Sequence, residues 1–232
     1  MPARLLILDN TVRRFLLRLP RHWTPYLEGV DVEVVNVPSG RPIPPPGDYT
    51  HLLLTGSETS ILEPRPWFDR EADAVREAAE RDLSILGSCF GHQMLVYALS
   101  GPAHLARSPV PEVGWIGIER LADDELLADA PSPWHTFSSH FDEVVDPPSP
   151  WRVLARSKDC AVQAIRYGER PIWGLQPHPE LPLAKARLFL SLYLLLSKRE
   201  RRRLILAMRK PSHEDRIADR IVSRFLASGR GD

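Results

Sequence analysis

One cysteine lies in a sequence pattern that suits a nucleophile. Cys89 is at the centre of a Gly-x-Cys-x-Gly pattern, directly after an apolar run typical of a strand and directly before a segment typical of a helix. This pattern predicts the sharp strand-to-helix turn called a nucleophile elbow, where small flanking residues let the chain pack closely. The sulfur would lie at the N-terminus of the helix, which stabilises a thiolate, and nearby backbone N–H groups could receive an oxyanion.

The alternative interpretation of Cys89 is a buried structural thiol, because free cysteine is among the residues most often buried. That interpretation leaves the flanking Gly87 and Gly91 unexplained. The other cysteine, Cys160, has no such surroundings, and we interpret it as structural. The sequence therefore favours Cys89 as the nucleophile.

A second segment supplies the base that a cysteine nucleophile needs. Residues 173–180 read Trp-Gly-Leu-Gln-Pro-His-Pro-Glu. In an extended chain, residues two apart face the same side, so His178 and Glu180 can point together, and the prolines between them restrict the backbone. A nucleophile requires a base within hydrogen-bond reach, and the base requires an acceptor that orients it. His178 is therefore the candidate base and Glu180 the candidate orienting acceptor.

The elements that must position these residues alternate through the first hundred residues. Short apolar runs bounded by turn residues predict buried strands, and the segments between them have helical spacing. We expect strands at 5–8, 32–37, 51–54 and 83–86, and helices at 11–19, 66–81 and 92–99. This alternation predicts a parallel sheet with helices on both faces.

The second half of the chain changes character. Short strands separated by Pro, Asp and Gly turns are expected at 115–119, 143–145, 151–157, 161–167 and 172–175, followed by a helix at 183–196. Such strands indicate an antiparallel extension. We therefore expect an α/β fold: a flavodoxin-like three-layer sandwich with a mainly parallel central sheet, helices on both faces and a small antiparallel extension.

The last segment differs in charge from the rest. We expect one domain over residues 1–196 and a basic helical C-terminal extension over 197–232. This extension contains 11 Lys and Arg residues but only 5 Asp and Glu residues. Charge runs usually mark exposed faces, so the simpler interpretation is a solvated helical pair packed on the domain through apolar residues such as Leu204, Ile221 and Phe225. The alternative is a contact surface for an acidic partner.

Composition excludes several classes of protein. The 232 residues carry no net charge, which gives no reason to expect a nucleic acid or a membrane surface as a partner. Two cysteines cannot form a disulfide framework, and no apolar stretch reaches the roughly 20 residues that cross a bilayer. The N-terminal apolar run is too short for a signal peptide. We expect a cytoplasmic protein.

Neither a metal nor a cofactor is predicted. The eight histidines lack metal-ligand spacing, and Cys89 with His92 would supply two ligands where a structural zinc site needs four. The sequence contains neither a Gly-x-x-x-x-Gly-Lys-Ser/Thr phosphate loop nor a dinucleotide-binding fingerprint.

Several motifs together resemble one family. Residues 87–93 (Gly-Ser-Cys-Phe-Gly-His-Gln) and 176–180 (Gln-Pro-His-Pro-Glu) resemble the two signature motifs of class I glutamine amidotransferases, in the same chain order. Residues 6–10 resemble the first strand of the family and residues 51–60 its oxyanion loop. Residues 138–144 resemble the Ser-His-x-Asp-x-Val segment of the GMP synthetase glutaminase domain. These motifs cover most of residues 3–196.

The resemblance implies a catalytic triad and a mechanism. Cys89 would attack the side-chain amide of glutamine, His178 would shuttle the proton and Glu180 would orient His178. Water would then release glutamate from the thioester while ammonia leaves. The oxyanion would be held by the backbone N–H groups of Phe90 and of Ser57, in the loop formed by Gly56 and Ser57.

The resemblance also places three residues at the amino-acid end of the substrate. Gln93 and Asp142 fall where the family holds this end, and His140 is their neighbour, which we expect to support the loop. A carboxylate such as Asp142 suits an α-ammonium group by charge. The alternative for Asp142 is a turn residue before a strand, since Asp is common in turns.

One departure concerns the oxyanion loop. Many relatives have Gly-Gly-Pro where this chain has Gly56, Ser57 and Glu58. Ser57 still offers its N–H, whereas Glu58 adds a carboxylate near the mouth of the pocket. The preference between L-glutamine and another γ-glutamyl compound is therefore open.

Three functions are compatible with the sequence. The first is a glutaminase that delivers ammonia to a separate synthetase, because the chain contains no nucleotide-activating domain. The second is a stand-alone γ-glutamyl hydrolase or peptidase, which uses the same intermediate without a partner. The third is a non-catalytic binding relative, which the presence of Cys89, His178 and Glu180 disfavours. We expect the first.

Overall fold

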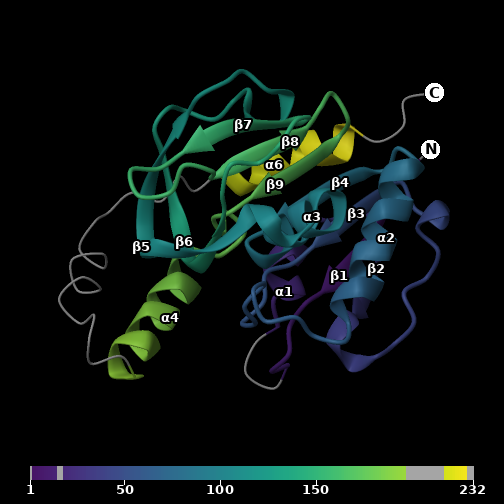
Figure 1. Cartoon of the computed structure of the whole chain (residues 1–232), viewed down its shortest axis with the longest axis horizontal. Helices are drawn as coiled ribbons and strands as arrows, with labels where there is room; N and C mark the ends of the chain where they lie inside the picture. The colour runs from purple at the N-terminus through teal and green to yellow at the C-terminus, as the bar shows by residue number, and fades with distance from the viewer. Residues whose placement is uncertain (1, 15–17, 197–216, 229–232) are drawn as a thin grey trace.

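The structure is a computed structural model that describes residues 2–14, 18–196 and 217–228. Its strands form one nine-stranded sheet in the order β2-β1-β3-β4-β9-β8-β7-β5-β6 (Figure 1). The strands are β1 (Arg4–Asp9), β2 (Asp31–Asn36), β3 (His51–Leu54), β4 (Ser84–Ser88), β5 (Leu105–Arg120), β6 (Trp134–Val144), β7 (Trp151–Arg156), β8 (Ala164–Tyr167) and β9 (Ile172–Leu175).

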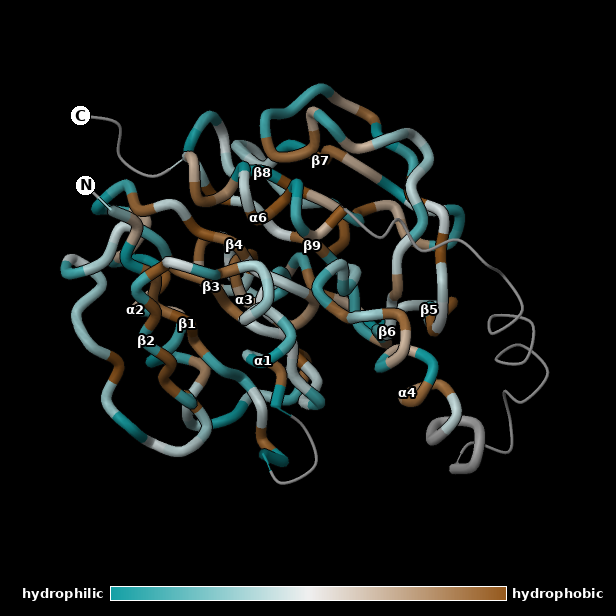
Figure 2. The backbone as a smooth tube through the Cα atoms, turned by 180° about the vertical axis from the view of Figure 1, so that it is seen from behind, coloured by the Kyte–Doolittle hydropathy of each residue, from teal (hydrophilic) through white to brown (hydrophobic). Residues whose placement is uncertain are grey.

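The parallel half of the sheet contains β2, β1, β3, β4 and β9. Its inner strands β1, β3, β4 and β9 are mostly buried and largely apolar, as expected where helices cover both faces of a sheet, and Figure 2 shows this apolar centre in brown. On one face, α2 (Phe68–Glu80) and α3 (Phe90–Ser100) pack against residues such as Leu52. On the other face, α1 (Pro20–Trp23) and α6 (Ile217–Ala227) pack against residues such as Leu53. The predicted alternation is confirmed here.

The antiparallel half is larger than the sequence suggested. Four strand pairings are antiparallel: β9 with β8, β8 with β7, β7 with β5 and β5 with β6. The expectation of a mainly parallel sheet with only a small antiparallel extension is therefore wrong, because the antiparallel pairings are as many as the parallel ones. The strand predicted at 115–119 is shorter than β5, because Pro109 and Pro111 lie within β5 and proline normally interrupts a strand. The β5–β6 register shifts between Arg107 and Glu112, and this irregularity accommodates both prolines.

The helix expected at 11–19 is not formed in the described residues. Thr11 is held in an irregular segment: its N–H donates to Asp9 Oδ1 at 3.0 Å, and its carbonyl accepts from Asn36 Nδ2 at 2.8 Å. Helix α1 begins only at Pro20, and residues 15–17 lie outside the described residues. The helices predicted at 66–81, 92–99 and 183–196 are confirmed, the last as α4 (Leu183–Leu196).

Helix α6 packs into the core. Ile217, Ile221, Val222 and Phe225 belong to the apolar cluster on the α1 side of the sheet, and His51 Nε2 contacts the carbonyl oxygen of Phe225 at 3.1 Å. Leu204 and its predicted apolar neighbours lie outside the described residues, and the boundary between a domain and an extension at residue 196 stays a prediction. In the described part of the chain, no helix is both long and apolar enough to span a membrane.

Candidate active site

Cys89 occupies the predicted elbow between β4 and α3. Its backbone has φ 51° and ψ −107°, a region that costs a residue with a side chain about 1–3 kcal/mol. The Cys89 N–H donates to the carbonyl of Leu175 at 2.7 Å, and the Cys89 carbonyl accepts from Gln93 N at 3.1 Å. The strained turn therefore lies between two hydrogen bonds, one to β9 and one to α3.

The glycines on either side of Cys89 are required by close approach of backbone. A Cβ on Gly87 would lie 2.5 Å from the carbonyl oxygen of Gly91. A Cβ on Gly91 would lie 2.7 Å from Cβ of Leu54, on β3. Real Cβ atoms do not approach other heavy atoms this closely, so α3 can follow β4 this tightly only with glycine at both positions.

His178 and Glu180 follow β9 and form the expected pair. His178 Nδ1 lies 2.9 Å from Glu180 Oε1, and the Ser88 hydroxyl lies 3.4 Å from both carboxylate oxygens. The backbone N–H of His178 also donates to the carbonyl of Phe137 at 2.8 Å, which connects this segment to β6. Because an ionised carboxylate only accepts, Nδ1 is the donor, and Nε2 remains for the thiol.

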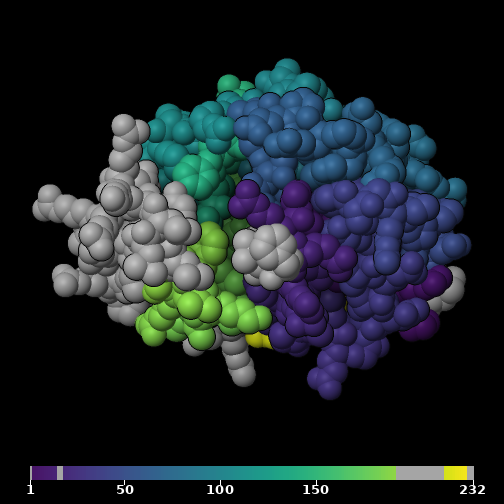
Figure 3. All heavy atoms as spheres, turned by 90° about the horizontal axis from the view of Figure 1, so that it is seen from below, coloured from purple at the N-terminus to yellow at the C-terminus, as the bar shows by residue number. Residues whose placement is uncertain are grey.

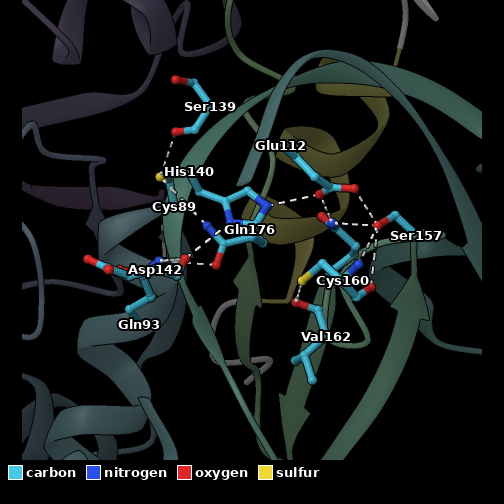
Figure 4. Close-up of polar contacts among 11 residues, drawn as sticks. Cys89, Gln93, Glu112, Ser139, His140, Asp142, Ser157, Cys160, Val162 and Gln176 are labelled. Carbon is cyan, nitrogen blue, oxygen red and sulfur yellow. Dashed lines mark hydrogen bonds and ion pairs between the residues drawn. The ribbon is translucent and has the colours of Figure 1, made fainter. Parts of the chain in front are cut away.

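The charges around His178 favour its protonated form. Burial alone lowers the pKa of His178, but the negative charges of Cys89 and Glu180, together with hydrogen bonds to both, raise this pKa well above 6.5. A histidine that holds a proton beside a cysteine stabilises the thiolate, which is the nucleophilic form. The Cys89 sulfur also lies 3.7 Å from Gln176 Nε2 and 3.8 Å from the Ser139 carbonyl (Figure 4).

The predicted oxyanion residues adjoin Cys89. A Cβ on Gly56 would lie 2.9 Å from His178 Cε1 and 3.6 Å from Cys89 Cβ, so the loop after β3 runs directly past the side chains of His178 and Cys89. Phe90 is the first residue of α3, where the helix itself offers no acceptor for a backbone N–H. Ser57 and Phe90 line one cavity with Cys89. Their role in holding an oxyanion stays a prediction.

Glu58, which departs from the family pattern, is tied to the N-terminal segment. One of its carboxylate oxygens accepts a hydrogen bond from the Arg13 N–H. In the same loop, Ser57 Oγ accepts from Thr59 N at 3.1 Å. The Glu58 carboxylate therefore helps to fix the path of the loop after β3.

The cavity has a volume of about 490 Å³ and brings the predicted residues together. All of them line it except Gly56 and Glu180, which lie against His178. Two segments far apart in the sequence both line the cavity: the first contributes Leu19 and His22, and α4 contributes Leu188 and Phe189. Figure 3 shows α4 in lime green beside the N-terminal residues in purple. His22 has a lowered pKa, mainly because of burial, with Glu180 as an opposing influence.

One wall of the cavity is polar and centres on Asp142. Gln93 Nε2 donates to the Asp142 carbonyl at 2.8 Å and to Gln176 Oε1 at 3.1 Å. Asp142 Oδ2 accepts from Ser60 Oγ at 2.6 Å, and Oδ1 forms an ion pair with Arg107 Nη1 at 2.9 Å. Asp142 itself is part of β6, so the interpretation of Asp142 as a turn residue before a strand is wrong.

Sequence reasoning missed Gln176, Ser60 and Arg107. Gln176 precedes His178 by two residues in an extended segment, so the same alternation that paired His178 with Glu180 could have identified it. Ser60 and Arg107 depend on the path of a loop and on the register between two strands. No sequence signal specifies these.

His140 lies behind Asp142 in a buried network (Figure 4). Its Nδ1 lies 3.1 Å from the Asp142 carbonyl oxygen and its Nε2 lies 2.9 Å from Glu112 Oε2. Glu112 also accepts from Ser157 Oγ and Gln163 Nε2, both at 2.6 Å. Both ring nitrogens of His140 thus lie within hydrogen-bond distance of an oxygen atom. The expected support of the substrate loop by His140 stays a prediction.

Glu112, His140 and Cys160 each place a potential metal-ligating atom within 4.8 Å of the others. The hydrogen bonds to both Glu112 oxygens explain this arrangement without an ion. A structural zinc site needs four ligands, and this group of described residues offers three. Burial raises the pKa of Cys160, which keeps its thiol protonated. Glu112, with His140, Ser157 and Gln163, thus forms a buried hydrogen-bond network.

The comparison with family models agrees with this geometry. Residues 24–189 match the glutamine amidotransferase class-I family, and this match covers more than half of the chain. The chain therefore belongs to the class I glutamine amidotransferase family.

Curated relatives include glutamine-hydrolyzing GMP synthase subunits from two organisms. The chain is 37% identical to the Pyrococcus abyssi protein over 102 residues, which are 44% of this chain and 53% of that protein. It is 32% identical to the Saccharolobus solfataricus protein over 153 residues, which are 66% of this chain and 78% of that protein. The first match thus spans about half of the relative's length.

A solved structure extends the similarity to nearly the whole chain. The crystal structure of a glutamine amidotransferase from Thermotoga maritima superimposes with a TM-score of 0.77, at 22% sequence identity, and the match covers 98% of this chain and 97% of that one. At this identity the match establishes the shared fold.

Proposed function

We propose that this chain is a glutaminase that hydrolyses the side-chain amide of L-glutamine through a thioester on Cys89 and delivers ammonia to a synthetase partner. The observation that carries this proposal is the placement of His178, fixed by Glu180, beside Cys89 at a strained strand-to-helix turn. Family membership and the names of the curated relatives support the choice of substrate and of partner.

The first half of the reaction forms the thioester. The Cys89 thiolate attacks the amide carbon of glutamine, and the oxyanion that results is held by the backbone N–H groups of Ser57 and Phe90. His178, which carries a proton, donates it to the departing nitrogen. The C–N bond then breaks, ammonia leaves and a glutamyl thioester remains on Cys89.

The second half of the reaction restores the enzyme. His178, now neutral, takes a proton from water, and the oxygen attacks the thioester carbon. The C–S bond breaks, glutamate leaves and Cys89 returns as a thiolate beside protonated His178. Glu180 stabilises the imidazolium at both stages, because its carboxylate accepts from Nδ1 throughout.

Three further features belong to this proposal. The parallel half of the sheet, with its helices, is the flavodoxin-like three-layer part of the fold. The synthetase partner is a separate chain that receives the ammonia, as the names of the curated relatives suggest. The reaction takes place in the cytoplasm, where glutamine and a reducing environment that preserves the thiol are both available.

The decisive experiment measures ammonia and glutamate release from L-glutamine by the purified chain. We expect Cys89→Ala to reduce the rate by at least ~10³-fold. Cys160→Ala is the matched control, because it removes the other thiol and leaves Cys89, His178 and Glu180 unchanged. Release that persists in the Cys89 variant would contradict the mechanism, and cleavage of γ-glutamyl peptides without cleavage of glutamine would contradict the substrate.

A further inference from the structure

We propose that Thr55 is a positioning residue for the reaction: its hydroxyl holds the Gly56 carbonyl and thereby turns the N–H of Ser57 toward the cavity. This inference rests on the proposed function and deepens it, because it names the side chain that orients one of the two oxyanion donors. Thr55 directly follows β3 and is fully buried, and it is not among the described residues that line the cavity. Its effect on the reaction must therefore pass through the backbone.

The hydrogen bonds around Thr55 determine the direction of its hydroxyl. The backbone N–H of Asn10 donates to Thr55 Oγ1 at 3.0 Å, so this oxygen acts as an acceptor on one side. The Thr55 hydroxyl donates to the Gly56 carbonyl, also at 3.0 Å. A hydroxyl carries a single donor hydrogen, so both roles of this oxygen are assigned. The Gly56 carbonyl is thus directed toward a buried side chain.

The planarity of the peptide transfers this direction to Ser57. The peptide between Gly56 and Ser57 is trans, and in a trans peptide the carbonyl and the following N–H point in opposite directions. The Ser57 N–H therefore points away from the Thr55 hydroxyl, on the side where Ser57 lines the cavity. Within the described residues this N–H has no acceptor. An unpaired N–H beside a nucleophile is suited to an oxyanion.

Glycine at position 56 makes such a constraint necessary. A residue without Cβ tolerates either orientation of the peptide that follows it, so Gly56 does not itself select one. A larger residue cannot replace it, because its Cβ would lie 2.9 Å from His178 Cε1. In the opposite orientation the Gly56 carbonyl oxygen would face the cavity and repel the oxyanion. The hydrogen bond from Thr55 opposes this rotation.

Further hydrogen bonds keep Thr55 itself in place. Asn10 Nδ2 donates to the Thr55 carbonyl at 3.2 Å and to Glu71 Oε1 at 2.8 Å. The Thr55 N–H donates to the Leu8 carbonyl, on β1, at 3.1 Å. Asn10 and Glu71 are fully buried, like Thr55. The N–H, the carbonyl and the hydroxyl of Thr55 are all paired, so its side chain is held in one position.

The test separates the hydroxyl from the shape of the side chain. Thr55→Val keeps the branched shape without the hydroxyl, whereas Thr55→Ser keeps the hydroxyl without the methyl group. We expect Thr55→Val to lower kcat for L-glutamine by ~10–100-fold and to change KM by less than ~3-fold, because the oxyanion exists only after attack. Thr55→Ser should keep kcat within ~3-fold of the unmodified chain.

Thr50→Val is the matched control. Thr50 lies directly before β3, at its other end, and its hydroxyl has the same two roles: it accepts from the Arg4 N–H at 2.9 Å and donates to the Arg4 carbonyl at 3.1 Å. This variant therefore loses an equivalent pair of hydrogen bonds away from the cavity. A decrease in kcat as large as that of Thr55→Val would overturn the proposal.

Alkylation of Cys89 shows whether the fold and the thiolate survive in Thr55→Val. Iodoacetamide reacts with the thiolate, and no oxyanion forms because the sulfur displaces iodide from a saturated carbon. In a Cys160→Ala background, the alkylation rate in Thr55→Val should stay within ~3-fold of the rate with Thr55. A parallel loss of alkylation and of kcat would overturn the proposal, because Thr55 would then only support the fold. Unchanged kcat would overturn it as well.

A second substrate separates this inference from the proposed function. L-γ-glutamyl-p-nitroanilide passes through the same kind of oxyanion, and its cleavage releases a coloured amine. Cleavage of the anilide but not of L-glutamine by the unmodified chain would contradict the glutaminase, and the loss of kcat in Thr55→Val would then be measured on the anilide. A chain that cleaves neither substrate would overturn both.

Discussion

Glu180 Oε1 lies 2.9 Å from Nδ1 of His178, and Glu180 is almost entirely buried. The carboxylate therefore does two things to the imidazole: it fixes which nitrogen faces Cys89, and it contributes negative charge that raises the pKa of His178. These two effects can be separated by experiment.

We expect Glu180→Gln to lower kcat/KM by on the order of 10²–10⁴-fold, because an amide can hold the wrong tautomer of His178 and carries no charge. The pKa of His178 should fall, so the alkaline limb of the pH–rate profile should move to lower pH. Glu169→Gln, at an exposed position, is the control. An alkaline limb at an unchanged pH would argue against an electrostatic role for Glu180.

Glu71 provides a pH-dependent term in stability. It is fully buried on α2, it accepts from Asn10 Nδ2 at 2.8 Å, and burial raises its pKa to about 8. A carboxyl group that binds its proton more tightly in the folded state makes stability fall as pH rises from about 4.5 to about 8. Asn10 Nδ2 also donates to the Thr55 carbonyl at 3.2 Å, which links Glu71 through Asn10 to the residue before Gly56.

We therefore expect Glu71→Gln, which does not titrate, to gain stability relative to the unmodified chain between pH 5 and pH 8, by on the order of a few kcal/mol. Urea unfolding at both pH values measures the change. Glu80→Gln on the exposed face of the same helix is the control and should show no such pH trend. An equal effect of Glu71→Gln at the two pH values would show that Glu71 does not titrate in this range.

We expect one glycine substitution to reduce activity and another to impair folding. In Gly56→Ala the new Cβ would meet the edge of the His178 ring at 2.9 Å, so activity should fall by ~10²-fold while the thermal midpoint changes little. In Gly87→Ala the new Cβ would meet the Gly91 backbone at 2.5 Å, which cannot move without α3, so folding itself should be impaired. Circular dichroism melts beside activity assays distinguish the two, and a reversed order would contradict this assignment.

Helix α6 should contribute measurably to stability. Phe225 is fully buried against the sheet, and truncating a buried aromatic residue usually costs about 3–5 kcal/mol. We expect Phe225→Ala to lower the free energy of unfolding by this amount, and Ser223→Ala, on the exposed face of the same helix, to leave it nearly unchanged. Similar denaturation midpoints for Phe225→Ala and the unmodified chain would mean that α6 does not complete the core.

Local patterns predicted the parts of the molecule that local physics determines. The elbow at Cys89 and the alternation that pairs His178 with Glu180 were readable because glycine and extended backbone impose short-range geometry. The length of β5 could not be predicted, because the irregular segment near Arg107 accommodates prolines that usually end a strand. The helix expected near Thr11 is absent because Asp9 of β1 and Asn36 of β2 hold that segment, and the contact with Asn36 joins residues 25 apart in the sequence.

The position of α6 has a consequence for the order of folding. Helix α6 follows all nine strands in the chain, yet it covers one face of the sheet and contacts β4, the strand that leads to Cys89. During synthesis the strands emerge first, and the part of this face that α6 covers stays exposed to water until residues 217–227 have been translated. The strained turn that holds the sulfur thus receives part of its support late, so a nascent chain that stops before α6 would contain Cys89, His178 and Glu180 without part of the core on this face.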